Sequence, residues 1–294
     1  MTFATASSVQ KRGDPKTIVA FLDESAASRG RLEFALAVCA TFEAHLVGLF
    51  VQLPPRAPSD DVSALAFARG GSGLDDAIDS YLGEQDVAVA EQRSRMDASA
   101  RERGFTAEWR SISSYASLRQ AALHCTYSDL LVLPHASHSE SLPWSAAELV
   151  LASGIPGVLV PDAWADSIGA RITVAWNAAR VARRAVSDAM PFLVRAEQVA
   201  IVLVDAQVGL GAHGEEPGAD VAQLLARHGV RAEVDQIESE GGSVADAILA
   251  HALRFRADLI VAGAYGHSRL VELVLGSTTR KLLLETSLPI LVSH

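Results

Sequence analysis

The chain contains two copies of one strand-and-helix pattern. The segment Thr17-Ile-Val-Ala-Phe-Leu-Asp23 corresponds to Arg171-Ile-Thr-Val-Ala-Trp-Asn177, and residues 128–132 correspond to residues 257–261. These apolar runs are continuous, which is typical of strands buried on both faces, and stretches with helical spacing lie between them. Strands that alternate with helices predict a parallel sheet. We therefore expect two α/β units, each with its own sheet.

The same pattern predicts five strands in each unit. Strands are expected at 17–23, 45–52, 105–112, 129–134 and 157–161, and again at 171–177, 198–205, 231–238, 258–263 and 288–293. Helices are expected at 27–42, 84–103, 115–125 and 145–153, and again at 179–195, 219–228, 243–256 and 277–286. The stretch from Pro161 to Gly169 is the expected linker, so the predicted domains are 1–165 and 166–294.

The first unit contains an extra segment. The offset between matched positions is 154 at Asp23 and Asn177 but 125 at Gly104 and Gly229, which leaves 29 additional residues in the first unit. They fall at 53–82, a stretch rich in Pro, Gly, Ser and Asp. Surface loops tolerate insertions of this kind, so 53–82 is interpreted as an inserted loop.

Composition narrows the class of protein. The chain has 294 residues, of which 49% are apolar, and this length favours two domains. Its formal net charge of -10 argues against nucleic acid and anionic membranes as partners, because both are bound mainly through Lys and Arg. Lysine occurs only at Lys11, Lys16 and Lys281, so the Gly-Lys-[Ser/Thr] loop of P-loop ATPases is excluded.

Neither targeting nor disulfide chemistry is indicated. The first 16 residues are polar and no apolar run is long enough to span a bilayer, so a cytoplasmic protein is expected. Cys39 and Cys125 lie within helical apolar patterns and are expected to be buried, unreactive thiols.

Glycines frame a candidate phosphate site in the second unit. Gly263 and Gly266 follow a predicted strand, and Gly276, Ser277 and Thr278 begin a predicted helix. A glycine after a strand lets backbone amides approach a ligand, and a Gly-Ser-Thr helix start offers unpaired N–H groups, a hydroxyl and the positive end of the helix dipole. The alternative interpretation is a simple turn and a helix cap.

At these residues the chain resembles the universal stress protein family. Its ATP-binding members carry the pattern G-x2-G-x9-G-[S/T] between the fourth strand and the last helix, and Gly263, Gly266, Gly276 and Ser277 match that spacing. The resemblance implies two tandem flavodoxin-like (HUP-type) domains, each a five-stranded parallel sheet of order 3-2-1-4-5 flanked by helices. It also implies ATP as ligand, with or without Mg²⁺, and with AMP and ADP as alternatives.

The resemblance further implies which strand ends meet the nucleotide. Trp176 and Asn177 end the first strand of the second unit, and Asn177 stands where the family usually has an aspartate. An asparagine has no charge, which puts metal coordination and hydrolysis in doubt. Val204 and Asp205 stand where the family holds adenine through backbone groups, with a ribose contact as the alternative for Asp205.

Cationic side chains beside the phosphates complete the predicted site. His267 and Arg269 lie between the two glycine pairs, and Arg280 and Lys281 lie one turn into the last helix. Charged donors form short, strong hydrogen bonds to phosphate oxygens. Solvent exposure is the alternative interpretation for each of them.

The first unit does not carry the glycine frame. Pro134 stands at the position of Gly263, Ser137 at that of Gly266, and Trp144 at that of Ser277. Proline lacks an amide donor, and the indole is bulky where a phosphate would sit. One nucleotide site is therefore expected, in the second unit.

Two other patterns are interpreted as coincidental. The string from Gly209 to Gly214 fits the dinucleotide pattern G-x-G-x-x-G, but Glu215 and Glu216 follow it and would repel a pyrophosphate. His124, Cys125, His135 and His138 are of ligand type but lie on different helix faces or in a loop, so no metal site is predicted. The sequence shows no catalytic group.

The leading hypothesis is an ATP-binding module for stress response or signalling, in which the nucleotide biases a conformation or a partner surface. Family members pair through their last strands across a two-fold axis, so residues 157–161 and 288–294 are expected to form an intramolecular pseudo-dimer; homodimerisation stays open. The alternatives are a slow ATPase or adenylating enzyme of the same superfamily, and a small-molecule binder that no longer uses ATP.

Overall fold

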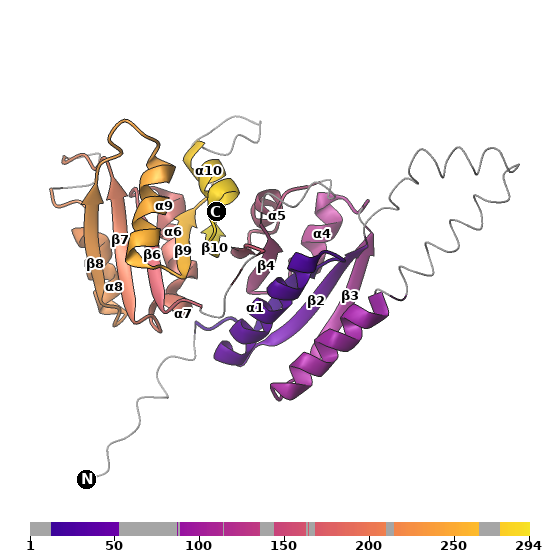
Figure 1. Ribbon diagram of the computed structural model, residues 1–294. Coiled ribbons are helices and arrows are strands. Elements are labelled where there is room, and N and C mark those ends of the chain that lie inside the picture. The colour runs from indigo at the N-terminus through magenta and orange to yellow at the C-terminus, as the bar shows by residue number, and fades with distance from the viewer. Residues whose placement is uncertain are drawn as a thin grey trace, which may run out of the picture.

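The computed structural model describes residues 13–52, 87, 89–113, 115–135, 144–162, 164, 168–209, 215–264 and 277–294. Their strands form one sheet in the order β3-β2-β1-β4-β5-β10-β9-β6-β7-β8 (Figure 1). The amino-terminal half supplies β1 (Thr17–Leu22), β2 (His45–Gln52), β3 (Ala107–Ser113), β4 (Leu130–Pro134) and β5 (Gly157–Val160). The carboxy-terminal half supplies β6 (Arg171–Ala175), β7 (Gln198–Val204), β8 (Ala232–Ile237), β9 (Leu259–Gly263) and β10 (Ile290–Ser293).

Each half has the predicted strand order 3-2-1-4-5 and is parallel throughout. The α/β fold class predicted from the sequence is therefore confirmed. The predicted inserted loop at 53–82 lies outside the described residues.

Helices cover both faces of the sheet. One face carries α1 (Ala26–Phe42), the helical residues 89–102, α6 (Arg180–Asp188), α7 (Met190–Leu193) and α8 (Ala219–Arg227). The other carries α4 (Leu118–Cys125), α5 (Ala146–Ser153), α9 (Val244–Phe255) and α10 (Ser277–Glu285). On each face one cluster of buried side chains runs through both halves, so the two halves share their cores.

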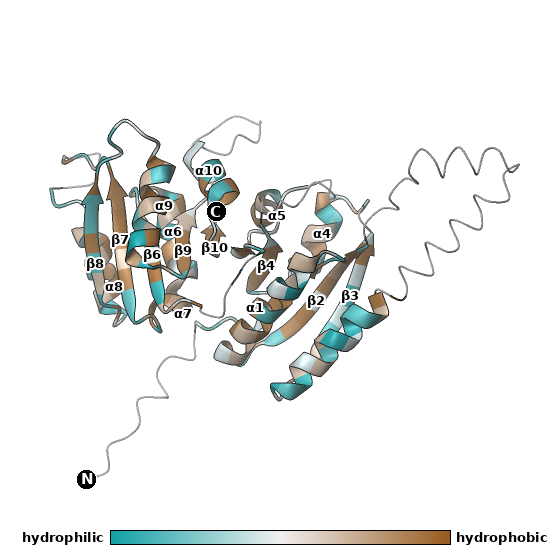
Figure 2. Cartoon of the chain, viewed as in Figure 1, coloured by the Kyte–Doolittle hydropathy of each residue, from teal (hydrophilic) through white to brown (hydrophobic). Residues whose placement is uncertain are grey.

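The strands show why their sequences are continuously apolar. Along β1, Ile18 and Leu22 contact the cluster under α1, whereas Val19 and Phe21 contact the cluster under α4 and α5. Successive side chains of a strand point to opposite faces, so a strand covered on both faces is apolar at every position. Figure 2 shows the result: the inner strand β7 is mostly hydrophobic, while the edge strand β8 mixes hydrophilic and hydrophobic residues.

The two halves are joined edge to edge. β10 pairs antiparallel with β5, with Leu291 opposite Val158 and Ile290 opposite Leu159. Both strands are fully buried. The last strands of the two halves thus pair within one chain, as the sequence predicted.

One predicted helix is divided in the structure. Residues 179–195 were expected to form a single helix, but α6 ends at Asp188 and α7 begins at Met190. Pro191 lies in the first turn of α7, where its missing N–H costs nothing. Inside a continuous helix the same proline would remove a hydrogen bond and clash with the preceding turn, so the helix is interrupted at Ala189 instead.

Candidate functional site

A cavity of about 430 Å³ lies where the parallel strands of the carboxy-terminal half end. Its wall combines the ends of β6, β7 and β9 with the first turns of α6, α9 and α10. The residues that line it are Ala175, Trp176, Asn177, Val181, Ala182, Val202, Val204, Val244, Ile248, Ala262, Gly263, Ser277, Thr278, Thr279 and Leu282. Parallel α/β sheets bind ligands at this edge, near the point where the strand order reverses.

Small side chains keep the cavity open at the sheet. Ala175, Val202 and Ala262 come from three adjacent strands, β6, β7 and β9, and all line it. Val202 is 1% exposed and Ala262 is 3% exposed, so both side chains are almost fully buried. The arrangement is suited to a flat apolar group, because ligand pockets of 300–1,000 Å³ are mostly apolar with a few polar groups that fix orientation.

Polar groups gather at the helix starts. Ser277, Thr278 and Thr279 form the first turn of α10, where backbone N–H groups have no partner within the helix. The N-cap of α6, Ala179, makes no capping hydrogen bond through its side chain. Amides and dipoles at helix N-termini favour anions, so this rim can accept negative charge without a cationic side chain.

Gly263 is required by packing within the protein. A Cβ added there would lie 2.5 Å from the backbone N of Ala182 and 2.6 Å from the backbone carbon of Val181. The end of β9 and the start of α6 therefore touch backbone to backbone. Thr279 on α10 adds a hydrogen bond from its hydroxyl to the carbonyl oxygen of Gly263, 3.3 Å away.

Six of the residues singled out in the sequence come together here. Trp176, Asn177, Val204, Gly263, Ser277 and Thr278 all line the cavity. Gly266, Gly276, His267 and Arg269 lie outside the described residues.

Asp205 lies away from this wall. Its side chain is exposed and does not line the cavity; one carboxylate oxygen accepts a hydrogen bond from the backbone N–H of Ser239, 2.9 Å away. That backbone hydrogen bond lowers the pKa of Asp205 below its ordinary value. In the described structure Asp205 ties the end of β7 to the turn after β8.

Asn177 and Lys281 already have partners within the protein. The side-chain oxygen of Asn177 accepts a hydrogen bond from the N–H of Ala179, 3.1 Å away, just before α6. The ammonium group of Lys281 lies 2.7 Å from a carboxylate oxygen of Asp246 and 3.8 Å from one of Glu285. The hydrogen bond to Asp246 raises the pKa of Lys281 and holds α10 against the first turn of α9.

The helical part of the wall was not predicted from the sequence. Val181 and Ala182 of α6, Val244 and Ile248 of α9 and Leu282 of α10 all line the cavity. Each belongs to the first or second turn after a predicted helix start. These lining residues could have been predicted, because helices that follow parallel strands begin at the edge of the sheet where the strands end.

The corresponding space in the amino-terminal half is filled. Phe21 on β1 stands at the strand position of Ala175, and Trp144 stands at that of Ser277. Their rings meet edge to face with centroids 5.8 Å apart, and the indole N–H of Trp144 donates to the carbonyl oxygen of Ala116. Trp144 is 4% exposed. Two aromatic side chains thus occupy the place that small residues leave hollow in the other half.

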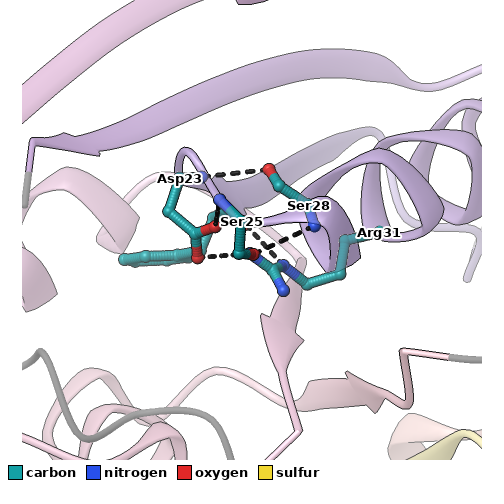
Figure 3. A network of polar contacts seen from close by, with 5 residues as sticks. Asp23, Ser25, Ser28 and Arg31 are labelled. Atoms are coloured by element: carbon teal, nitrogen blue, oxygen red, sulfur yellow. Dashed lines mark hydrogen bonds and ion pairs between the residues drawn. The ribbon is translucent and has the colours of Figure 1, made fainter. Parts of the chain in front are cut away.

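A partly buried ion pair lies at the strand end beside them (Figure 3). Asp23 stands at the position of Asn177, and its carboxylate lies 2.5 Å from the guanidinium of Arg31 on α1. Arg31 also donates to the carbonyl oxygen of Phe21. The backbone N–H of Asp23 donates to the hydroxyl oxygen of Ser28, and the backbone N–H of Ser25 donates to the carboxylate of Asp23. Burial lowers the pKa of Arg31, with Asp23 opposing that shift.

The described residues contain no group of three or more His, Cys, Asp or Glu placed to hold a metal ion. His135 is buried and His138 lies outside the described residues. None of the helices in the described part of the chain has the length and apolarity to cross a bilayer.

Comparison with known proteins identifies the family that the carboxy-terminal half matches. Residues 171–294 match the Universal stress protein family, and they contain the whole cavity described above. These residues are a universal stress protein domain. The match confirms, for this carboxy-terminal half, the resemblance seen in the sequence.

Curated relatives match over part of their length. The stress response protein NhaX of Bacillus subtilis is 33% identical over 78 residues, which is 26% of this chain and 45% of the relative. The universal stress protein Slr1230 of Synechocystis is 38% identical over 69 residues, which is 24% of this chain and 23% of the relative. The chain thus aligns with less than half the length of either relative.

Solved structures extend the similarity of fold to nearly the whole chain. A universal stress protein from Archaeoglobus fulgidus DSM 4304 superposes with a TM-score of 0.66 at 18% identity, covering 94% of this chain and 95% of that one. A protein of unknown function from Pseudomonas aeruginosa PAO1 gives a TM-score of 0.55 at 14% identity, covering 95% and 92%. At these identities the likeness concerns the fold.

Proposed function

We propose that the carboxy-terminal half binds an adenine nucleotide, with ATP as the principal ligand and AMP or ADP as alternatives. The observation that supports this most directly is the cavity of about 430 Å³ whose wall combines small apolar side chains with the first turn of α10. The apolar wall suits a purine ring, and the helix start suits phosphate oxygens. Gly266, His267, Arg269 and Gly276 are proposed to complete the phosphate side.

The role we propose is a stress-response or signalling module, divided into domains at 1–165 and 166–294 that act as an intramolecular pseudo-dimer in the cytoplasm. Residues 171–294 match the Universal stress protein family, and a relative named for stress response matches 26% of the chain, which supports this role. Nucleotide occupancy would bias a conformation or partner surface, and the filled amino-terminal half would serve as scaffold.

Hydrolysis is not part of the proposal. Mg²⁺ prefers oxygen ligands, usually one or two carboxylates together with phosphates. The described lining of the cavity offers neutral oxygens only, and the side-chain oxygen of Asn177 is engaged with Ala179. The residues present therefore fit Mg²⁺ poorly, and we derive no step through the metal.

Thermal unfolding with ATP, AMP or no ligand, each with and without Mg²⁺, tests the proposal. ATP at 100 times its Kd should stabilise the protein by about 2.7 kcal/mol through mass action. The variant Gly276→Val should lose this shift while keeping the melting temperature of the unliganded wild type. Gly13→Val is the matched control, because an added Cβ there meets nothing within 4 Å. Equal ATP-induced shifts in wild type and Gly276→Val would refute the site.

A second candidate function is binding of an uncharged small molecule. None of the fifteen described lining residues is ionisable, and nine are Ala, Val, Ile or Leu. Native mass spectrometry of the purified protein separates the two candidates. A co-purified nucleotide supports the first, and a neutral ligand that ATP fails to displace supports the second.

A further inference from the structure

One continuous stretch connects the nucleotide cavity to the other half of the chain. At its start, Val181 and Ala182 of α6 line the cavity and touch the backbone of Gly263. At the end of α6, the carboxylate of Asp188 accepts a short hydrogen bond from the hydroxyl of Ser293 on β10. The chain then turns directly into α7, whose Phe192 faces the amino-terminal half.

The contact made by α7 is aromatic and charged. Phe192 meets Phe42, the last residue of α1, edge to face with centroids 5.0 Å apart. The guanidinium of Arg195 lies 4.8 Å from the centre of the Phe42 ring and binds both carboxylate oxygens of Asp14, at 3.0 and 2.8 Å. Lys16 donates to the carbonyl oxygen of Phe42, 3.0 Å away. We call Asp14, Phe42, Phe192 and Arg195 the junction cluster.

Hollow space lies on both sides of the junction cluster. One hollow of about 330 Å³ extends from Asp14 and Asp129 to Arg184 and Phe192. A second of about 230 Å³ extends from Phe42 to Ile168, with Phe192 and Arg195 in its wall. Phe192 therefore borders both. Close-packed interiors resist displacement, so space on two sides makes this contact easier to shift than one inside a core.

The other end of the stretch has no such freedom. The start of α6 is already in backbone contact with Gly263, so it cannot move toward β9. A ligand that presses on Val181 and Ala182 can displace α6 only away from the sheet or along its own axis. Because α6 and α7 are separated by the single residue Ala189, that displacement reaches Phe192.

We propose that occupancy of the cavity is coupled to the contact between the two halves through a rigid shift of α6 and α7, with the junction cluster as the responding element. This proposal rests on the proposed nucleotide site and states how that site would be linked to the contact between the two halves. Coupling between sites is reciprocal in binding free energy, so a substitution that biases the junction contact is expected to alter nucleotide affinity.

Isothermal titration with ATP measures this coupling in the full-length chain. Asp14→Asn removes the negative charge that Arg195 binds. Arg195→Ala removes both the hydrogen bonds to Asp14 and the guanidinium stacked on the Phe42 ring. Phe42→Leu keeps an apolar side chain but removes the ring. Each is expected to change the Kd for ATP by about fivefold or more, the lower end of typical coupling. None of these residues lines the cavity.

Two control variants are matched to these changes. Arg103→Ala breaks an ion pair with Glu33 at 2.7 Å in which Arg103 has an exposure similar to that of Arg195, and Phe50→Leu removes a ring stacked on Trp109 in the amino-terminal half. Both should keep the wild-type Kd within twofold. Junction variants that also stay within twofold of wild type would overturn the coupling.

Hydrogen exchange supplies a second readout and separates the two proposals. ATP should change amide exchange at residues 190–196 in wild type, and this change should be smaller in Arg195→Ala. Wild type that binds no nucleotide would refute the proposed function and the coupling with it. Wild type that binds ATP with unchanged exchange at 190–196, together with unaltered affinity in the junction variants, would refute the coupling alone.

Discussion

The two halves share one strand frame but differ in what stands at the ends of their strands. At positions matched by strand register or helix start, the amino-terminal half has the larger residue at four positions that border the cavity in the other half. The matched pairs are Phe21 and Ala175, Leu49 and Val202, Leu133 and Ala262, and Trp144 and Ser277. Backbone topology provides the place for a site, and side-chain volume decides whether the site is hollow.

The two halves also differ in the charged residues that follow their first strands, β1 and β6. The turn after β1 holds the ion pair of Asp23 and Arg31, whereas the turn after β6 has Asn177 and, on α6, Ala185 at the position of Arg31. Arg31 is buried, so removing Asp23 would leave its charge uncompensated, and this cost holds the turn in one arrangement. The amino-terminal half is therefore expected to be the more rigid at its strand ends.

The largest effect should come from emptying the filled half. Trp144→Ala removes a buried indole and its hydrogen bond to Ala116, and losses of this kind typically cost about 3–5 kcal/mol. Urea unfolding monitored by circular dichroism measures this cost. Tyr127→Ala, at a side chain that is 88% exposed, should change stability by less than about 0.5 kcal/mol. Comparable costs for both variants would contradict the packing role of Trp144.

Filling the hollow half is the next test. The double variant Ala175→Phe with Ser277→Trp copies the aromatic pair of the amino-terminal half into the cavity. ATP affinity should fall by about 100-fold or more, which is about 2.7 kcal/mol, because the rings occupy the volume that the base needs. Titration calorimetry gives the affinity, and circular dichroism checks that the domain stays folded. A folded double variant with wild-type affinity would place the nucleotide elsewhere.

A smaller effect is expected at Gly263. Gly263→Ala forces a Cβ against the backbone of Ala182, and overpacking of this kind costs about 1–3 kcal/mol. The loss should show in thermal unfolding of the unliganded protein. Gly276→Val, by contrast, is expected to spare unliganded stability. A Gly263→Ala protein as stable as wild type would mean that α6 yields easily, which would weaken the case for a rigid shift.

The smallest effect concerns the two thiols, both in the amino-terminal half. Burial raises the pKa of Cys39 and of Cys125 to about 12, against 9.0 when exposed. Native protein should therefore react slowly with a thiol reagent at pH 8, and denatured protein should react fast. Because the folded-state pKa is raised, any stability from these thiols is complete below pH 9 and declines as pH rises toward 12. Rapid labelling of native protein at pH 8 would contradict this.

Local patterns in the sequence predicted the sheet well, because continuous apolar runs such as β1 and β6 mark strands buried on both faces. They also predicted Trp144 as an obstruction. They did not predict that Phe21 would complete it, since that depends on two segments meeting in space. The packing reason for Gly263 is similarly non-local, because it comes from the backbone of α6. The resemblance implied that Asp205 lies near the ligand; in the structure its side chain is exposed and accepts a hydrogen bond from the backbone N–H of Ser239, which depends on two segments meeting in space.

The antiparallel pairing of β5 with β10 also limits how whole chains can assemble. Each half uses one edge of its sheet, β5 or β10, to pair with the other half. The edge strands of the described sheet are therefore β3 and β8. Because both partners belong to one polypeptide, their pairing persists at any dilution, unlike that of separate subunits. A half expressed alone would leave an apolar strand edge uncovered and should self-associate through it.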